Sequence, residues 1–130
     1  WTLNNFIGFI IMTLLSSLAA GAFGVLLATA ARSRHQLSGF SMIIILVMSA
    51  VGGSMIPRFF MPEIMQNLGY LTFNTWSLMG YQEVFWYALP GDSLGTMLLS
   101  LWDIAVTLLC STMICLVIAR QLARRRWEAG

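Results

Sequence analysis

One uncharged apolar stretch constrains this chain more than any other feature. Residues 6–31 contain no Asp, Glu, Lys or Arg. Roughly 20 apolar residues cross the hydrocarbon core of a bilayer as a helix, and a longer run spans it with some tilt. Over the whole chain 58% of the residues are hydrophobic and 9% are charged, whereas a soluble domain carries about 25% charged residues. The sequence therefore predicts an integral membrane protein.

Two further apolar runs complete an all-α architecture. One ends before Pro57, and the other is interrupted by a single charge, Asp103. The chain begins with Trp1 and has no basic segment before its first apolar run, which argues against a signal peptide. We expect it to be the C-terminal part of a longer polypeptide. The single transmembrane domain fragment is expected to have spans at 6–31, 37–56 and 94–119, an outer hairpin at 57–93 and a tail at 120–130.

The arginines predict the orientation. Positive residues in short loops stay on the cytoplasmic side. The chain has no lysine, and the 32–36 loop and the 120–127 tail carry every arginine except Arg58. Both basic ends fit the cytoplasmic side, so the hairpin faces outward and the C-terminus is cytoplasmic.

Small residues recur at every fourth position of the first span. Such a face lets another helix approach closely, which in lipid replaces the hydrophobic drive between helices. The alternative is that small residues are simply common in membrane helices, and neither interpretation indicates chemistry. The predicted helix-packing set is Ser16, Ala20, Gly24 and Ala28.

A polar stripe follows one side of the third span. Ser100, Asp103, Thr107 and Ser111 fall at helical spacing, and should face protein or a water-filled cavity because unpaired polar groups in lipid are costly. Asp103 lies about nine residues into the span, roughly 13 Å along the axis. That depth leaves a substrate role open, but it favours a hydrated acid with a structural hydrogen bond.

The hairpin is divided into two short helices. Pro62 suits a first helical turn, Glu63 complements the helix dipole there, and Gly69 favours a stop. Asn74 is predicted to cap a second helix over about residues 75–87, whose aromatic content is typical of an interfacial helix. Non-helical backbone at membrane depth needs cover from protein or water, so a re-entrant or interfacial hairpin is expected against the bundle or a subunit interface.

Enzymatic chemistry is not predicted. A phosphate-binding GxxxxGK[ST] loop is absent, so ATP hydrolysis is expected elsewhere. His35 lies in a basic loop without a carboxylate or cysteine partner, and the five-residue spacing of Cys110 and Cys115 indicates neither a disulfide nor a metal pair. No catalytic, cofactor-binding or metal-binding residue is assigned, and no nucleic-acid partner is expected.

The order of features resembles the C-terminal half of the transmembrane subunit of type-2 ATP-binding-cassette (ABC) exporters. A span ending in the letters GGSMIP is followed by a P-E-x-x-Q-x-L-x-Y-L-x-x-x-x-W pattern. The family usually has Asn-Pro where this chain has Asn74-Thr75. The residues that match the pattern are Pro62, Glu63, Gln66, Leu68, Tyr70, Leu71 and Trp76.

This resemblance implies helices four to six of a six-helix permease subunit in a plasma membrane, with a bacterial inner membrane expected. It implies lipid surroundings, a second permease copy or paralogue, and an ABC ATPase bound from the cytoplasm. The ATPase-coupling loop would be Arg32, Ser33, Arg34, His35 and Gln36, although Arg32 and Arg34 could merely fix topology. The outer re-entrant gate would comprise Gly52, Gly53, Pro57, Pro62, Glu63, Asn74, Trp76 and Glu83; Glu83 either seals a pathway or, as we favour, points to external water.

A second class of function is a small channel or a membrane anchoring or assembly subunit without ATP coupling. A channel needs a polar stripe lining a symmetric pore, and only the third span has one. An anchoring subunit needs no re-entrant segment. Co-purification with an ABC ATPase would separate these classes from a permease.

Overall fold

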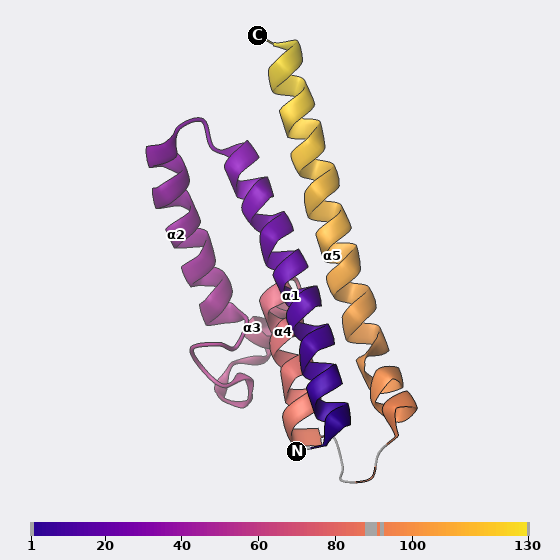
Figure 1. The fold of residues 1–130 in the computed structure, drawn as a ribbon. Coiled ribbons are helices and arrows are strands. Elements are labelled where there is room, and N and C mark those ends of the chain that lie inside the picture. Colours follow the sequence, from indigo (N-terminus) through magenta and orange to yellow (C-terminus); the bar gives the residue numbers. More distant parts are fainter. Residues whose placement is uncertain (1, 88–90, 92, 130) are drawn as a thin grey trace.

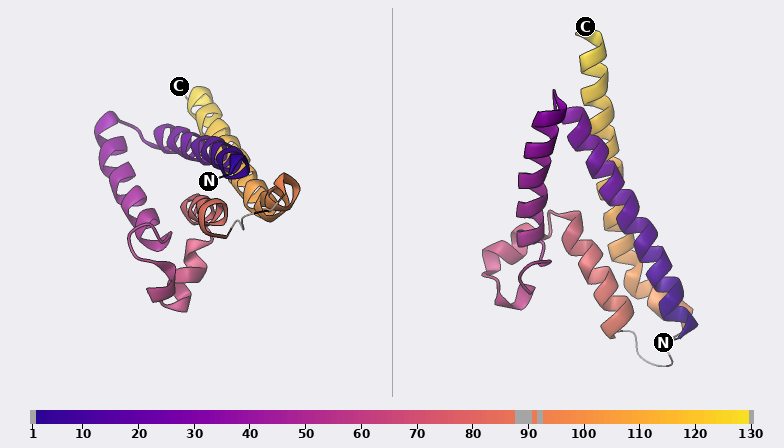
Figure 2. Two further views of the ribbon diagram at one scale, coloured as in Figure 1. Left: turned by 60° about the horizontal axis from the view of Figure 1, so that its bottom comes forward. Right: turned by 60° about the vertical axis from the view of Figure 1, so that its left-hand side comes forward.

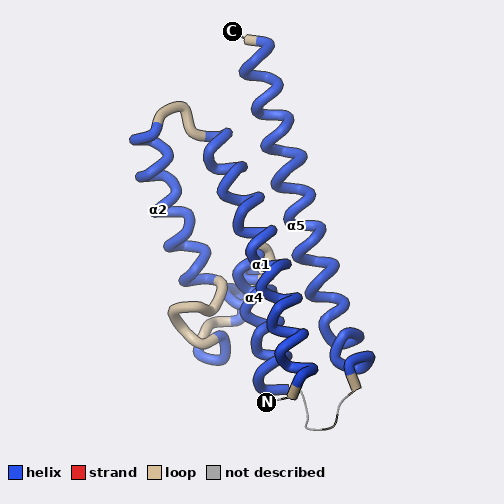
Figure 3. The backbone as a smooth tube through the Cα atoms, in the orientation of Figure 1, coloured by secondary structure: helices blue, strands red, loops and turns tan. Residues whose placement is uncertain are grey.

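Helices make up the regular structure of this protein. The computed structural model describes residues 2–87, 91 and 93–129, and the described part contains no strand (Figure 3). Its elements are α1 (Leu3–Ala30), α2 (Arg34–Val51), the 3-10 turn η1 (Arg58–Phe60), α3 (Glu63–Gly69), α4 (Phe73–Gln82), the π-helical turn η2 (Glu83–Tyr87) and α5 (Leu94–Glu128) (Figure 1).

Three of these helices, α1, α2 and α5, are long and apolar enough to cross a membrane. The predicted all-α fold with three membrane-length helices is therefore confirmed. The helices alternate in direction, so the 31–33 loop and the C-terminus lie at one end, and the N-terminus and the start of α5 at the other (Figure 1). The arginine-rich tail is not a separate segment, because α5 continues unbroken to Glu128.

The core forms where α1, α4 and α5 meet. α1 and α5 pack side by side along most of their length, and α4 lies against both (Figure 2). Gly80 of α4 lies in this packing, and an added Cβ there would overlap the end of the fully buried Met12 side chain, which would have to shift. The buried apolar cluster comprises Met12, Ala19, Val84, Met97, Leu101, Ile104 and Leu108.

α2 stands apart from this core and contains no buried residue (Figure 2). It begins at Arg34, capped by Ser33, and ends at Val51 although the apolar run continues to Ile56. The early end has a backbone cause. Gly53 has φ +89°, and the Ser54 N–H donates to the Ser49 carbonyl at 3.2 Å, which together form a Schellman C-cap.

Candidate functional site

The first helix of the hairpin follows the predicted pattern. α3 has Pro62 as its N-cap, Glu63 in its first turn and Gly69 as its last residue. Gly69 does not adopt a positive φ, so conformational freedom is not the reason for a glycine here. The reason is close approach, because an added Cβ would lie 2.8 Å from the Val51 carbonyl oxygen.

The prediction that Asn74 caps the second helix is wrong. α4 begins two residues earlier than predicted, at Phe73, and its N-cap is Thr72, whose hydroxyl accepts from the Thr75 N–H at 3.4 Å. Asn74 instead donates from Nδ2 to the Ser54 hydroxyl at 2.7 Å. Its side chain ties the start of α4 to the segment that follows α2, a tertiary contact that local capping rules do not anticipate.

Three helix ends meet in what we call the helix-end junction, formed by Val51, Gly52, Gly69, Thr72 and Thr75. Thr75 is fully buried, and its hydroxyl donates to the Gly52 carbonyl at 3.2 Å. The Thr72 hydroxyl donates to the Gly69 carbonyl at 2.8 Å. The two threonines therefore satisfy carbonyls at the ends of α2 and α3, which in a water-poor site would be costly to leave unpaired.

Arg58 braces this junction, a role that the sequence prediction missed. Its Nη2 donates to the Gln66 carbonyl at 3.0 Å, and its guanidinium lies 4.3 Å from the centre of the Tyr70 ring, a cation–π contact. Its stem lies beside Gly53, where an added Cβ would come 2.7 Å from the Arg58 Cγ. The sequence feature that could have predicted this role is a single arginine in an apolar segment, because such a charge needs hydrogen-bond or cation–π partners within the protein.

Together α4 and η2 run antiparallel to α1 along much of the length of α1. At one end, the Phe73 and Phe23 rings lie 5.5 Å apart. At the other, Asn5 donates to the Val84 carbonyl at 3.0 Å. These partners on α1 are 18 residues apart in sequence, equivalent to about 27 Å of helix at 1.5 Å per residue. The second hairpin helix thus lies beside the bundle instead of projecting from it.

A cavity of about 590 Å³ opens between α2 and α5. The bend of the hairpin, residues 70–73, forms one of its boundaries, and Phe23 and Leu26 of α1 contribute another. Of the predicted polar stripe, Thr107 and Ser111 line this cavity, together with the two cysteines, which are free. Ser100 and Asp103 are exposed and are not among its lining residues.

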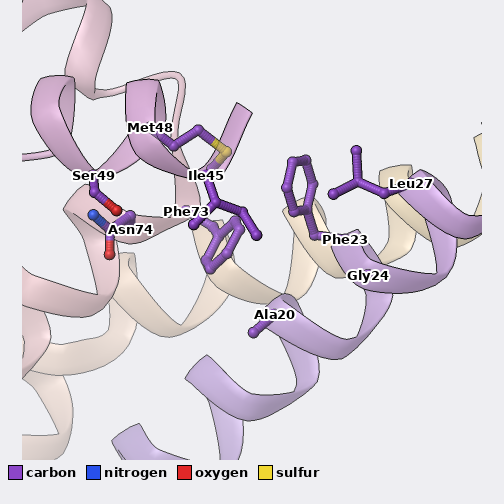
Figure 4. Close-up of a pocket in the computed structure, with 9 residues that line it drawn as sticks. All are labelled: Ala20, Phe23, Gly24, Leu27, Ile45, Met48, Ser49, Phe73 and Asn74. Carbon is purple, nitrogen blue, oxygen red and sulfur yellow. The ribbon is translucent and has the colours of Figure 1, made fainter. Parts of the chain in front are cut away.

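A smaller groove of about 240 Å³ separates α1 from α2. Figure 4 shows Ser49 and Asn74 together at one end of it, with Phe23 and Leu27 at the other. Ala20 and Gly24 from the predicted packing set line the groove, and no atom lies within 4 Å of a Cβ added to Gly24. Within the described chain, no helix covers the small-residue face at this position.

The predicted coupling loop is ordered by its own hydrogen bonds. The Ser33 hydroxyl accepts from the Gln36 N–H at 3.1 Å, and the Gln36 side-chain oxygen accepts from the Arg32 N–H at 2.8 Å. This reciprocal arrangement is close to a capping box. The five side chains of residues 32–36 are exposed, so this loop presents a defined cationic surface at one end of the molecule.

The remaining predicted gate residues are more dispersed. Pro57, Pro62 and Glu63 are exposed, whereas Glu83 is half-buried and begins the π-helical turn. Trp76 faces the bend, because its indole N–H donates to the Tyr70 carbonyl at 2.8 Å. The structure thus brings Gly52, Asn74 and Trp76 near the bend. Gly53 follows Gly52 and lies close to Leu78 of α4, whereas Glu83 lies at the far end of α4.

Residues 1–86 match the ABC-2 type transporter family. This region covers α1, α2 and the hairpin through all but the last residue of η2. Neither the curated proteins nor the solved structures include a match. The family match covers well over half of the chain, and the three apolar helices agree with a multi-pass membrane protein. The chain belongs to the ABC-2 type transporter family.

Proposed function

We propose that this chain is part of the permease subunit of an ABC exporter, coupled to a separate ATPase that hydrolyses ATP. The family match over residues 1–86 carries the proposal, because ABC-2 permeases are membrane components that typically work with an ATPase. Three membrane-length helices and a hairpin packed beside them support the same role.

The proposed orientation puts residues 32–36 and the C-terminus in the cytoplasm of a bacterial cell. Six arginines lie at that end of the molecule, and Arg58 lies near the other end of α2. The positive-inside rule favours this arrangement over its inverse. The hairpin and the N-terminus then belong to the outer half.

We assign the hairpin to an outer re-entrant gate. Its bend reaches the level of Phe23 on α1, and α4 returns toward the N-terminal end of the bundle. A backbone turn at that depth is tolerated when protein covers it. The helix-end junction supplies this cover through the Thr75–Gly52 and Thr72–Gly69 hydrogen bonds.

The cavity between α2 and α5 is our candidate for part of the substrate pathway. The hairpin bend bounds it through Tyr70, Leu71, Thr72 and Phe73, where a gate would act. Its described lining contains no charged side chain, and hydroxyls from Thr107 and Ser111 supply polarity. These surroundings suit an apolar or amphipathic substrate better than a bare ion, whose desolvation they would not offset.

A second permease copy completes the proposed pathway. It would pack on the small-residue face of α1, where Ala20, Gly24 and Ala28 are exposed. Lipid covers the apolar surfaces that neither copy buries.

Reconstitution tests this function directly. The full-length protein should co-purify with an ABC ATPase, and proteoliposomes containing both should move a fluorescent amphipathic probe only when ATP is supplied. An ATPase variant that binds but does not hydrolyse ATP is the matched control. Absence of an associated ATPase together with nucleotide-independent flux would instead identify a channel. Absence of an associated ATPase and of any flux would identify an anchoring subunit.

A further inference from the structure

The C-terminal end of α5 reaches across to the end of α1. Arg126 donates from Nη1 to the Ala31 carbonyl at 2.9 Å and from Nη2 to the Ala30 carbonyl at 3.0 Å. These residues are 95 and 96 positions apart in the sequence, so the contact is a tertiary one. Nothing in the local pattern of the arginine cluster distinguishes Arg126 from its neighbours.

Geometry explains why an arginine is suited to this place. The last carbonyls of a helix lack N–H partners within the helix, and they carry its partial negative charge. α1 ends at Ala30, and Ala31 is already extended, with φ −74° and ψ 143°. A planar guanidinium can donate two parallel hydrogen bonds to two adjacent acceptors, whereas an ammonium acts as a point donor.

The contact fixes one side of the exposed 32–36 loop. Ala31 is buried, and the next residue begins the internal hydrogen bonds that order the loop. On one side of the loop, its own hydrogen bonds cap the start of α2. On the other side, Arg126 holds the end of α1. In the described part of the chain, Arg126 is the side chain of α5 that donates hydrogen bonds to these two carbonyls.

We propose that Arg126 is a positioning residue for the ATPase-coupling loop. It holds the Ala30 and Ala31 carbonyls so that the loop meets its partner in one orientation. This inference rests on the proposed function for its consequence, but the restraint on the loop is testable without any ATPase.

The first measurement reports loop order directly. A spin label on a cysteine at position 35, in a background with Cys110 and Cys115 replaced by serine, is read in nanodiscs without ATPase. Arg126→Gln should increase the mobile fraction at position 35 severalfold. Arg125→Gln is the matched control, since it removes the same charge one residue away and should leave the spectrum unchanged. Arg126→Lys keeps the charge with a single point donor, and should give an intermediate spectrum.

The second measurement titrates the co-purified ABC ATPase onto nanodiscs that contain the same arginine variants with His35 unlabelled and intact. Arg126→Gln should weaken binding about tenfold relative to Arg125→Gln, the factor that corresponds to about 1.4 kcal/mol. Equal weakening by both variants would attribute the effect to charge and overturn the positioning role. Unchanged label mobility in both Arg126 variants would overturn it as well. If the unmodified protein binds no ATPase, the proposed function fails, while the label experiment still decides whether Arg126 restrains the loop.

Discussion

The hydroxyl of Thr75 donates to the carbonyl of Gly52 at 3.2 Å and so joins the start of α4 to the end of α2. Thr75 is fully buried, so water does not compete for this hydrogen bond. The bond spans 23 residues of sequence that include all of η1 and α3. Attachment of the hairpin to α2 therefore depends on a few polar contacts as well as on apolar burial.

Replacing Thr75 by valine tests this attachment. Valine keeps the shape of threonine but leaves the Gly52 carbonyl without its donor, which costs about 1–3 kcal/mol for a buried group. Thermal unfolding of the full-length protein in detergent should show a lower Tm for Thr75→Val. Thr75→Ser retains the hydroxyl, so an equal loss in both variants would argue against the hydrogen bond.

Gly69→Ala should disturb the same junction by steric contact. The new Cβ would lie 2.8 Å from the Val51 carbonyl oxygen and 3.1 Å from the Thr75 hydroxyl, so α3 must move away from α2. We expect a destabilisation of about 1–3 kcal/mol, typical of overpacking. Denaturation in detergent measures it.

The matched control is Gly21→Ala, where no atom lies within 4 Å of the added Cβ. Alanine in a helix interior stabilises by roughly 0.5–1 kcal/mol relative to glycine, so this variant should be at least as stable as the parent. Similar losses in both variants would contradict close approach as the reason for Gly69.

Arg32 and Arg34 test the coupling loop. Both are exposed at the end of the molecule that carries the arginine-rich tail. Replacing both by glutamine should weaken ATPase binding by roughly tenfold, about 1.4 kcal/mol, while the protein still inserts. The Arg124→Gln, Arg125→Gln double variant loses the same charge and serves as the control. If it weakens binding as much, contact through the loop is not the cause.

Gly24→Leu tests the small-residue face of α1. Within one chain the leucine meets open groove, so the Tm should stay within a few degrees of the parent. Energy transfer between labelled copies in proteoliposomes should nevertheless fall severalfold, because close helix approach is lost. Gly39→Leu, on α2 with equally open surroundings, provides the comparison. Undiminished transfer in Gly24→Leu would remove this face from the proposed subunit contact.

The sequence predicted the elements better than their connections. Long apolar runs indicate α1, α2 and α5 because length and composition alone decide whether a helix can span a bilayer. The start of α3 followed from Pro62, which acts locally, whereas Gly69 ends the helix where expected but for a tertiary reason, its close approach to Val51. The capping residue of α4 did not, because Thr72 and Asn74 are both good caps, and Asn74 instead bonds to Ser54, which is distant in sequence.

Local sequence patterns could not predict the contacts of the candidate site for the same reason. For Arg58 and Arg126, the sequence indicates only the charge that each adds to a loop or tail. In the structure, each guanidinium donates to carbonyls of another segment, and the positions of those acceptors depend on how α1, α3 and α5 are arranged. Periodicity contains no information on that arrangement.

The absence of buried residues along α2 has a mechanical consequence. Apart from a few contacts with α1, the helix is tied at its ends: by the short loop next to Arg34 and by the junction at Gly52. Its backbone hydrogen bonds make it a stiff rod, and few side chains must repack when it shifts. Within the described chain, α2 is therefore a rigid element attached mainly at its two ends.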